Sequence, residues 1–318
     1  MAAPRDKTIL VTGAAGFAGS HLLDRLGGSG ATIVGWYRPD MPAPARAGVQ
    51  WRGVELTDRA GVAAAIAEAA PAEIYHLAGA PSVETSWTNA VPHLQINALG
   101  THHLLEAVRL AGTPCRVLVV TSAQVYDMSE RALDEDGRLQ PSTPYGLTKL
   151  AQDEIARQAA AEGLAVIVAR PFNHIGPRQT AGFAIASFAR QVARIEAGLD
   201  APVIRVGNLE PRRDLSDVRD VADAYVRLMA SGVSGRAYNV CAGTAHRIGD
   251  VLDTLLRLAT VSVTKETDAT RLRPNDVPVI VGDATRIRSE IGWSPRVPFE
   301  MTLRDTLDWW RAEVRAGR

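Results

Sequence analysis

The chain has 318 residues, and its 35 lysines and arginines balance 35 aspartates and glutamates, so the formal net charge at pH 7 is zero. A chain of this length can bury a large core and predicts one large domain or two closely joined lobes. Because no overall charge attracts nucleic acid or an anionic membrane surface, we expect neither partner and favour a small molecule.

The cysteines and the hydropathy pattern bear on the compartment. Cys115 and Cys241 are far apart and show no CxxC or Cys/His ligand spacing, which favours a reduced intracellular protein without a metal site. Residues 1–7 lead into the first strand without an apolar signal segment, and no apolar stretch approaches the ~20 residues that a membrane span needs. We therefore expect a cytoplasmic protein.

Strand-like and helical segments alternate through the first half of the chain. In order, the pattern predicts a strand at 8–12, a helix at 19–26, a strand at 32–36, a helix at 61–70, a strand at 73–77, a helix at 97–111 and a strand at 116–121. A helix at 145–161 and a strand at 165–169 continue the alternation. Continuously apolar strands separated by helices indicate a doubly wound α/β fold, a parallel Rossmann sheet covered on both faces.

The second half of the chain is less regular. A loop, a helix near 183–197 and a strand at 203–206 are followed by a proline-containing tail from residue 246. These features predict a smaller, interleaved C-terminal substrate-binding lobe. The expected division is a dinucleotide-binding domain of residues 1–171, to which 214–245 return, and a substrate lobe of 172–213 and 246–318.

The stretch VTGAAGFAGS follows the first strand and opens a helix. Gly13 permits the tight turn, Gly16 allows backbone to approach a pyrophosphate, and Gly19 completes the spacing of the dinucleotide-binding fingerprint. The N-terminus of the following helix offers free N–H groups and the positive end of its dipole. We expect Gly13, Gly16, Phe17 and Gly19 to bind a dinucleotide.

The end of the second strand bears on the choice of cofactor. The acidic residue that commonly binds the adenosine ribose is missing from IVGWYRPD, where Trp36 and Tyr37 precede Arg38. An arginine suits a 2′-phosphate, and a charged hydrogen bond of ~1.5–3 kcal/mol gives a roughly ten- to hundred-fold preference. We favour NADP(H) over NAD(H), and the alternative is a solvated Arg38.

A catalytic set follows from PSTPYGLTKL, which places Tyr145 and Lys149 on one face of a helix start. A phenol with a pKa of ~10 must lose about three units to exchange protons readily at neutral pH, and we expect the charge of Lys149 to lower it. Lys149 can also bind the nicotinamide ribose. Ser122, at the end of the fourth predicted core strand, can donate to the same substrate oxygen as Tyr145.

With these residues the chain resembles, over nearly its full length, the extended short-chain dehydrogenase/reductase family of sugar-nucleotide epimerases, dehydratases and reductases. The matching segments are TGAAGFAG, YHLAG (75–79), INALGT (96–101), Ser122 and YGLTK. The resemblance implies that His76, Leu77, Ala78 and Asn97 lie near the cofactor. The alternative for Asn97 is a helix cap.

The same resemblance implies a homodimer in which helices 97–111 and 145–161 pack against their mates. The sequence itself shows only apolar faces on these helices, including Leu99, Leu104, Leu105 and Val108. An intramolecular core could equally bury these side chains.

The loop TSAQVYD (121–127) indicates which reaction the site can catalyse. Related dehydratases carry an acid/base pair directly after the hydroxyl residue, whereas this chain has Ala123 and Gln124. Neither side chain exchanges a proton at neutral pH, so dehydration is disfavoured and carbonyl reduction remains. Gln124 becomes a candidate substrate contact.

Four later segments resemble the GDP-mannose 4,6-dehydratase branch of the family, most of all its GDP-4-keto-6-deoxy-D-mannose reductases. They are RPFNHIGPRQ (170–179), VGNLEPRRDLSDVRDV (206–221), YNVCAG (238–243) and RLRPNDVPVIVGDATRIRSEIGWSP (271–295). The resemblance implies NAD(P)H-dependent reduction of a C4 ketone to give GDP-D-rhamnose.

Several polar residues of these segments are substrate-binding candidates. Arg213 and Arg273 can converge on diphosphate oxygens, and Asn173 can bind a sugar hydroxyl or the diphosphate. By resemblance Arg178 borders the substrate loop. His174 is a family signature residue that either orients the loop or contacts ligand. The run at 134–136 is interpreted as a solvated loop and not a metal site, because nothing completes an oxygen cage.

The chain departs from the family pattern at Asp127, where glycine is usual, at Leu215, where an aromatic residue is usual, and at Asp276, where glutamate is usual. The last change makes guanine recognition less secure than diphosphate binding. One alternative function is an NAD-dependent nucleotide-sugar 4-epimerase, which uses the same Ser, Tyr and Lys. Another is a nucleotide-sensing protein on an inactive enzyme fold, which the intact catalytic set disfavours.

Overall fold

The computed structural model describes residues 7–129, 131–271 and 277–318. Its main sheet has seven parallel strands in the order β10-β6-β5-β4-β1-β2-β3. These strands are β1 (Thr8–Thr12), β2 (Thr32–Tyr37), β3 (Val49–Gly53), β4 (Glu73–His76), β5 (Arg116–Val120), β6 (Ala165–Pro171) and β10 (Ala237–Val240). The strand order reverses between β1 and β4, and ligands bind at such a switch point in open α/β sheets.

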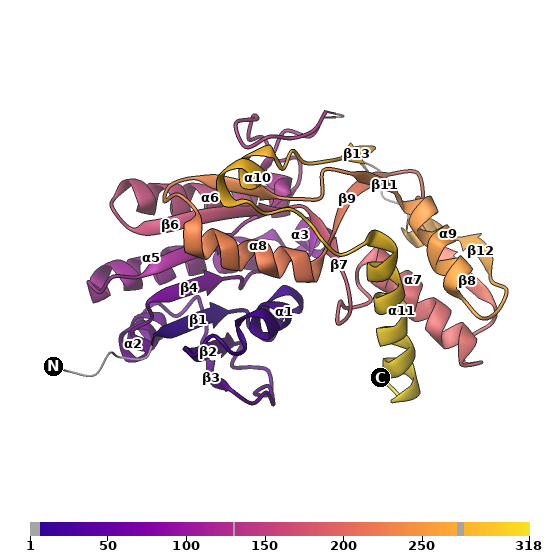
Figure 1. Ribbon diagram of the computed structural model, residues 1–318, viewed down its shortest axis with the longest axis horizontal. Coiled ribbons are helices and arrows are strands. Elements are labelled where there is room, and N and C mark those ends of the chain that lie inside the picture. Colours follow the sequence, from indigo (N-terminus) through magenta and orange to yellow (C-terminus); the bar gives the residue numbers. More distant parts are fainter. Residues whose placement is uncertain (1–6, 130, 272–276) are drawn as a thin grey trace.

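Helices cover both faces of this sheet (Figure 1). Successive strand residues point to opposite faces, and the buried core divides accordingly. Val11 packs with α1 (Phe17–Leu26) and α8 (Val218–Ser231), whereas Leu10 packs with the other helical layer. That layer consists of α2 (Arg59–Ala69), α5 (Gly100–Ala111) and α6 (Pro144–Ala161). The sheet is therefore a doubly wound α/β structure, as the sequence predicted.

The second lobe lies at one end of the molecule (Figure 1). A four-stranded sheet contains β7 (Asn173–Ile175), β9 (Arg212–Asp217), β11 (Ala245–Arg247) and β13 (Val279–Ile280), and a two-stranded sheet pairs β8 (Val203–Val206) with β12 (Thr264–Thr267). Three helices pack a separate apolar core there: α7 (Ala184–Glu196), α9 (Ile248–Leu258) and α11 (Phe299–Arg315). Leu215 lies in this core, so an apolar residue replaces the aromatic one that the family pattern has.

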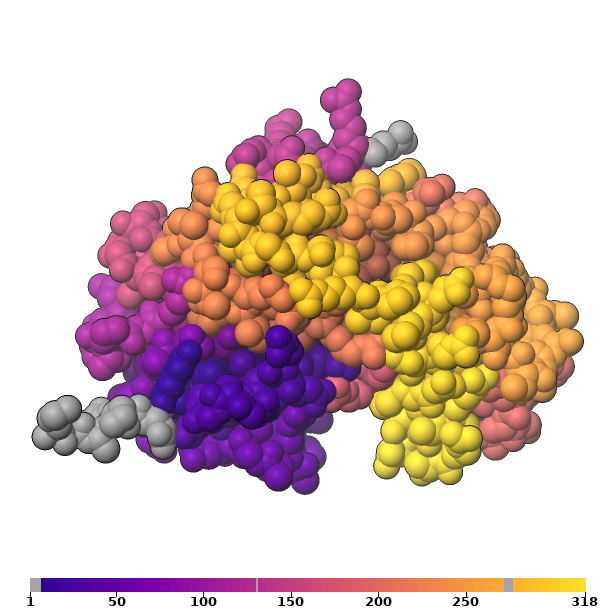
Figure 2. All heavy atoms as spheres, viewed as in Figure 1, coloured from indigo at the N-terminus to yellow at the C-terminus, as the bar shows by residue number. Residues whose placement is uncertain are grey.

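The C-terminal part of the chain joins the two lobes. In Figure 2 its yellow residues run across the visible face from above the main sheet to the second lobe. After α10 (Thr285–Ile291), the indole of Trp293 donates to the carbonyl of Asp220 on α8, 3.1 Å away. The Asp220 carboxylate accepts from the backbone N–H groups of Arg296 and Val297. Helix α8 thus anchors the crossing segment.

Three details differ from the sequence prediction. The strand β3 was missed because its alternating, half-exposed residues VQWRG lack an apolar run, so the strand before Ser122 is the fifth along the chain. The helix predicted at 97–111 begins as a π-helical turn, Gln95–Leu99, after two short helices, α3 (Val83–Thr88) and α4 (Ala90–Leu94). Residues 214–217 pair in the second sheet, with β11 at 214 and with β7 at 215–217, and the chain rejoins the main sheet through α8 and β10.

The proposed domain division, 1–171 with 214–245 and 172–213 with 246–318, otherwise stays a proposal. Among the described residues, no helix combines the length and the apolar character that crossing a membrane requires.

Candidate active site

The glycine loop brings the ends of β1 and β4 into contact. Gly13 has a φ of +66°, and a Cβ there would lie 2.8 Å from the backbone nitrogen of Ala78. A Cβ on Gly19 would lie 2.2 Å from the carbonyl oxygen of Gly13. Only glycine permits this packing, which leaves the N-terminus of α1, preceded by Gly16 without a side-chain cap, open to an anion. These residues fit a bound dinucleotide phosphate.

The end of β4 passes close to the predicted catalytic lysine. The Thr12 hydroxyl accepts from the backbone N–H of Ala78 at 3.1 Å, which fixes the segment containing Leu77 and Ala78 against β1. A Cβ on Gly79 would meet Asn97 Oδ1 at 2.8 Å and Lys149 Nζ at 3.3 Å. The structure therefore brings the glycine loop, the 77–79 segment, Asn97 and Lys149 together.

Asn97 closes the loop after β4 and does not cap a helix. It lies inside the π-helical turn, fully buried, and its Oδ1 accepts from the backbone N–H of Ala80 at 2.8 Å. Its Nδ2 donates to the Thr148 hydroxyl at 2.9 Å and to the Ala80 carbonyl. The helix-cap alternative was wrong, because α4 precedes this turn without a break and Asn97 turns inward instead.

Tyr145 stands in the first turn of α6, whose start the sequence determines locally. Thr143 caps the helix by accepting from the N–H of Gly146 at 2.9 Å, and Pro144 occupies the first helical position. The backbone N–H of Tyr145 donates to Ser86 Oγ on α3. Ser122 Oγ accepts from the N–H of Gln124 and shares a hydrogen bond with the Tyr145 side chain.

Burial sets the protonation of this pair. It raises the pKa of Tyr145 to about 12, although the hydrogen bond with Ser122 acts in the lowering direction. Burial also lowers the pKa of Lys149 to about 7. The predicted drop in the Tyr145 pKa is therefore wrong for the chain alone, because desolvation disfavours the phenolate and the ammonium alike. At neutral pH Tyr145 carries its proton and can donate it.

Arg38 extends from the end of β2 into solvent. Its guanidinium forms a two-point ion pair with Asp40, with Nε 2.9 Å from Oδ1 and Nη2 2.5 Å from Oδ2. Both side chains are about two-thirds exposed, so water screens the pair and a phosphate can compete for the arginine. The role of Arg38 toward a 2′-phosphate stays a prediction.

The substrate-binding candidates are spread over two lobes. Gln124 is half-buried in a 3-10 turn next to Ser122, and Asn173 is exposed on β7. Arg213 on β9 donates to the backbone carbonyls of Val277 and Pro278. Arg273 and the atypical Asp276 lie outside the described residues, so convergence of Arg213 and Arg273 on a diphosphate stays a prediction.

Arg178 contacts the helix of the glycine loop. Its guanidinium pairs with Asp24 and lies 2.7 Å from His21 Nδ1, both on α1. His174 stacks on Phe17 with a centroid distance of 5.7 Å and an interplanar angle of 7°. Strand β7 and the segment after it therefore pack on α1, at Phe17 between the glycines and at His21 and Asp24 beyond them. Substrate contact by Arg178 stays a prediction.

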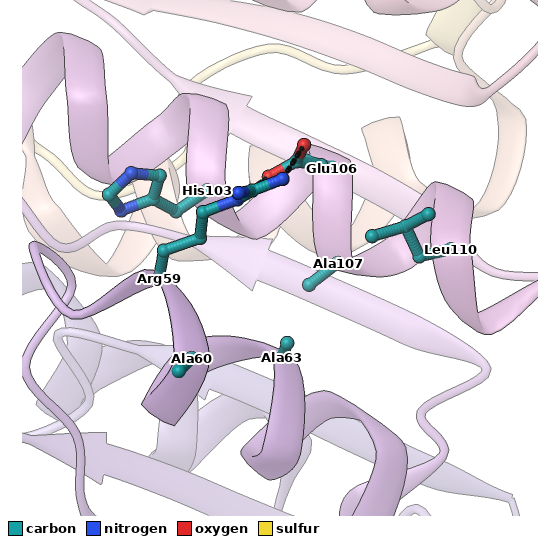
Figure 3. Close-up of a pocket in the computed structure, with 7 residues that line it drawn as sticks. All are labelled: Arg59, Ala60, Ala63, His103, Glu106, Ala107 and Leu110. Carbon is teal, nitrogen blue, oxygen red and sulfur yellow. Dashed lines mark hydrogen bonds and ion pairs between the residues drawn. The ribbon is translucent and has the colours of Figure 1, made fainter.

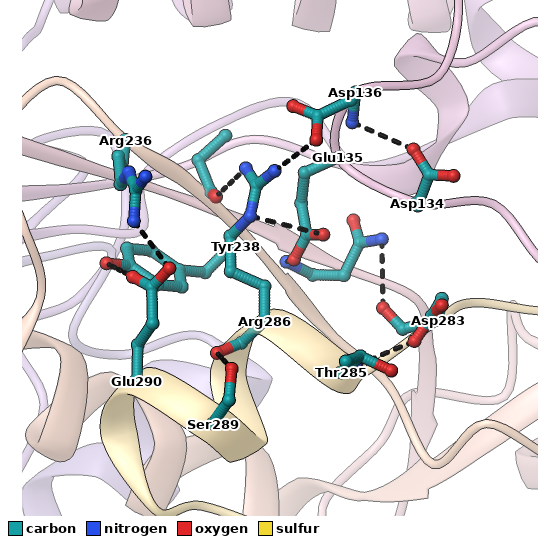
Figure 4. A network of polar contacts seen from close by, with 12 residues as sticks. Asp134, Glu135, Asp136, Arg236, Tyr238, Asp283, Thr285, Arg286, Ser289 and Glu290 are labelled. Atoms are coloured by element: carbon teal, nitrogen blue, oxygen red, sulfur yellow. Dashed lines mark hydrogen bonds and ion pairs between the residues drawn. The ribbon is translucent and has the colours of Figure 1, made fainter.

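The acidic run at 134–136 belongs to a network of polar contacts with distant parts of the chain (Figure 4). Glu135 has a side-chain exposure of only 4%, and its Oε1 accepts from the backbone N–H of Asn239 at 2.8 Å. Arg286 on α10 pairs with both Glu135 and Asp136. The solvated-loop interpretation is wrong for Glu135, because its partners lie about a hundred positions or more along the chain.

Sequence reasoning also missed a buried ion pair beneath the catalytic set. Arg170, 2% exposed, donates two hydrogen bonds to Asp153 on α6, at 2.8 and 2.9 Å, and a third to the hydroxyl of Tyr126. Asp153 follows Lys149 by four residues, which puts it on the same helix side. Arg170 ends an apolar run in the sequence, and no local pattern indicated that Asp153 is its partner.

A surface groove of about 280 Å³ lies elsewhere, between α2 and α5 (Figure 3). Arg59 spans it with a two-point ion pair to Glu106, and none of the predicted site residues lines it. Within the described ranges, no group of three or more His, Cys, Asp or Glu side chains is placed to bind a metal ion.

The parallel sheet, the glycine loop at its switch point and the buried Ser122, Tyr145 and Lys149 define an NAD(P)-dependent oxidoreductase of the extended short-chain dehydrogenase/reductase type. A family model described as GDP-mannose 4,6 dehydratase matches residues 10–306. The chain belongs to this GDP-mannose 4,6-dehydratase family.

Individual relatives cover almost the whole chain. GDP-6-deoxy-D-mannose reductase of Pseudomonas aeruginosa is 36% identical over 317 residues, which span 96% of this chain and 98% of the relative. The structure of RMD from Pseudomonas aeruginosa complexed with NADPH superposes with a TM-score of 0.85 at 34% identity, covering 96% of this chain and 99% of that one. MoeE5 in complex with UDP-glucose and NAD gives 0.85 at 29% identity with the same coverage.

Proposed function

We propose that the protein reduces the C4 ketone of a GDP-4-keto-6-deoxy-hexose with NAD(P)H, giving GDP-D-rhamnose. The observation that carries this proposal is the pairing of buried Ser122 and Tyr145 without a titratable side chain at positions 123 and 124. Such a site can protonate an alkoxide but cannot remove water from a sugar. The Pseudomonas aeruginosa relative described as a GDP-6-deoxy-D-mannose reductase supports the same reaction.

The chain's own residues supply orientation and a proton. The Ser122 hydroxyl donates to the ketone oxygen, and Tyr145, protonated because its pKa is about 12, transfers its proton to that oxygen as negative charge develops there. Bound reduced nicotinamide supplies the hydride for the carbonyl carbon. Lys149 places positive charge and a hydrogen-bond donor beside the cofactor ribose.

NADP(H) is the favoured cofactor and NAD(H) is possible. Gly13, Gly16 and Gly19 form the cradle for the pyrophosphate, and Arg38 is near enough to the end of β2 to meet a 2′-phosphate. The relative RMD binds NADPH, whereas MoeE5 binds NAD. Phe17, Leu77, Ala78 and Asn97 complete the proposed cofactor contacts.

The proposed substrate contacts are Gln124 beside the reacting centre and Asn173, Arg178, Arg213 and Arg273 toward the nucleotide. Arginine forks bind phosphate oxygens in two-point geometry, which suits a nucleoside diphosphate.

We also propose a cytoplasmic homodimer. Leu104, Leu105 and Val108 are buried in the chain's own core, but five large apolar side chains near the start of α6 and the π-helical turn are exposed. They are Trp87, Val91, Leu94, Leu99 and Leu147. An exposed apolar surface of this kind suits a second copy of the chain.

A nucleotide-sugar 4-epimerase is the second candidate, because it needs the same Ser122, Tyr145 and Lys149, and MoeE5, a structural relative, binds UDP-glucose and NAD. The exposed Arg38 favours the reductase, which must exchange its cofactor at each turnover.

The test mixes cofactor-free protein with GDP-4-keto-6-deoxy-D-mannose and either NADPH or NADH, and follows the absorbance of the reduced nicotinamide. Stoichiometric oxidation establishes the reductase and ranks the cofactors. Absence of oxidation, together with interconversion of GDP- or UDP-hexoses in the presence of NAD, supports the epimerase instead.

A further inference from the structure

A chain of buried polar side chains connects Lys149 to the glycine loop. Gln152 Oε1 accepts from Lys149 Nζ at 2.7 Å, and Gln152 Nε2 donates to Thr101 Oγ1 at 2.9 Å. The same Thr101 oxygen lies 2.9 Å from His76 Nε2, and His76 Nδ1 lies 2.8 Å from the hydroxyl of Thr12 on β1. Gln152, Thr101, His76 and Thr12 are fully buried.

The hydrogen atoms in this series of hydrogen-bonded side chains have only one consistent arrangement. Thr101 gives its single hydroxyl hydrogen to the carbonyl of Asn97 at 2.7 Å, so it accepts from both Gln152 and His76. His76 therefore carries its hydrogen on Nε2 and accepts on Nδ1 from Thr12, whose oxygen in turn accepts from the N–H of Ala78. Burial lowers the pKa of His76 to about 3, which keeps the ring neutral.

This arrangement fixes the orientation of the Gln152 amide. A flipped amide would turn its NH₂ group toward the ammonium of Lys149 and its oxygen toward Thr101, which has no hydrogen left to donate. The amide oxygen must therefore face Lys149. The ammonium has three donors, of which one binds Gln152 and one binds the carbonyl of Val120 at 3.2 Å.

We propose that Gln152 is a positioning residue: oriented by Thr101 and His76, it holds the Lys149 ammonium with neutral acceptors alone and leaves one donor for the cofactor ribose. The inference rests on the proposed function for its link to the ribose. That Gln152 positions Lys149 follows from the geometry of the hydrogen-bonded side chains alone.

The neutral character of the acceptor matters because few charges face Lys149. From β4 it meets the neutral ring of His76. Asp153, the next carboxylate on α6, is paired with Arg170 and Arg157. Burial thus lowers the pKa of Lys149 to about 7, without a carboxylate contact to offset it.

The sequence offers a direct experiment, since Lys7, Lys149 and Lys265 are the chain's three lysines. Protein carrying ¹³C at the lysine ε-carbon gives three NMR signals, and Lys7 and Lys265 are partly exposed. The pH titration of the Lys149 signal in cofactor-free protein reports its protonation without any turnover. The dissociation constant of NADPH, measured from the fluorescence of the nucleotide, reports the position of the Lys149 ammonium.

Gln152→Glu places a carboxylate against the ammonium and is expected to raise the Lys149 midpoint by about one to three pH units. Gln152→Met keeps the side-chain length without an acceptor, and is expected to lower the midpoint and weaken NADPH binding about ten-fold. Gln158→Glu, on the exposed side of the same helix, is the matched control and should leave both readouts unchanged.

A second pair of variants tests the orienting hydroxyl. Thr101→Val removes the oxygen that fixes the amide and should weaken NADPH binding, whereas Thr101→Ser keeps that oxygen and should restore it. An unchanged Lys149 titration in folded Gln152→Glu, or wild-type NADPH affinity in Gln152→Met, overturns the proposal. Neither readout needs the keto-sugar, so failure of the proposed function would show separately, as wild-type protein that binds NADPH but does not oxidise it.

Discussion

The two halves of the site are built differently. On the main-sheet side, Lys149 is 5% exposed, Arg170 is 2% exposed and Asn97 is fully buried, and each makes hydrogen bonds to more than one chain segment. On the second-lobe side, Asn173 is exposed on a three-residue strand. The groups proposed to perform the chemistry are therefore fixed by packing, whereas a group proposed to bind the sugar nucleotide stands on the surface, where it can change at little cost in stability.

The largest effect is expected for Tyr145→Phe. Removing the phenolic hydroxyl deletes the proton donor and should lower kcat by roughly 10²- to 10⁴-fold. The NADPH dissociation constant should change little, because the ring and its packing remain. Steady-state kinetics with GDP-4-keto-6-deoxy-D-mannose and a fluorescence titration check the two parts. Retention of most of the turnover would show that Tyr145 is not the donor.

The second largest effect is expected at the buried ion pair of Asp153 and Arg170, on the main-sheet side of the site. Asp153→Asn leaves the guanidinium of Arg170 buried without a counter-charge, and should cost about 3–5 kcal/mol in the free energy of unfolding. Urea denaturation measures it, with Glu154→Gln on the exposed side of α6 as control. Replacing both partners, Asp153→Leu with Arg170→Met, should recover much of the loss. A stability equal to wild type for Asp153→Asn alone would contradict the assignment.

Arg38 tests cofactor choice at the exposed rim. Arg38→Ala should weaken NADPH binding by roughly ten- to hundred-fold, equivalent to ~1.5–3 kcal/mol, and leave NADH within a few-fold of wild type. Fluorescence titration with each nucleotide gives the ratio. Because Asp40 is the present partner of Arg38, Asp40→Asn serves as a control and should preserve or strengthen the NADPH preference.

The pH dependence of the free energy of unfolding should reveal the buried, neutral histidines. His76 has a pKa of about 3 in the folded chain against 6.5 as its ordinary value, so the unfolded chain binds more protons between these values. Stability is therefore lost as pH falls below about 6.5, by about 2 kcal/mol at pH 5 from this residue. His21 and His174, whose pKa values burial also lowers, act in the same direction.

Urea unfolding at pH 7.5, 6 and 5 checks this expectation. His21→Gln should reduce the slope only in part, because His76 and His174 remain. Equal stability at pH 5 and 7.5 would mean that His76 is not buried as a neutral ring.

The local motifs predicted which residues of the main-sheet side would lie together, whereas the catalytic roles of these residues stay a proposal. The glycine spacing, the apolar strand before Ser122 and the four-residue interval between Tyr145 and Lys149 each depend on residues close in the chain, and the structure brings these residues together. Strand β3 escaped prediction because an exposed edge strand has no continuous apolar run.

What the sequence by itself determined is the alternation of strands and helices, the glycine turn and the spacing of the proposed catalytic residues, because backbone geometry and periodicity act over a few residues. Only the tertiary structure decided that Asn97 closes a loop, that Glu135 is buried against Asn239, and that Gln152 faces Lys149. The protonation of Tyr145 and Lys149 likewise depends on burial, which is a property of the assembled core. The partners of Asn97 and Glu135 lie 17 and 104 positions away and leave no local pattern, and the amide of Gln152 is oriented by Thr101, which lies 51 positions away. Desolvation exists only once the chain has folded.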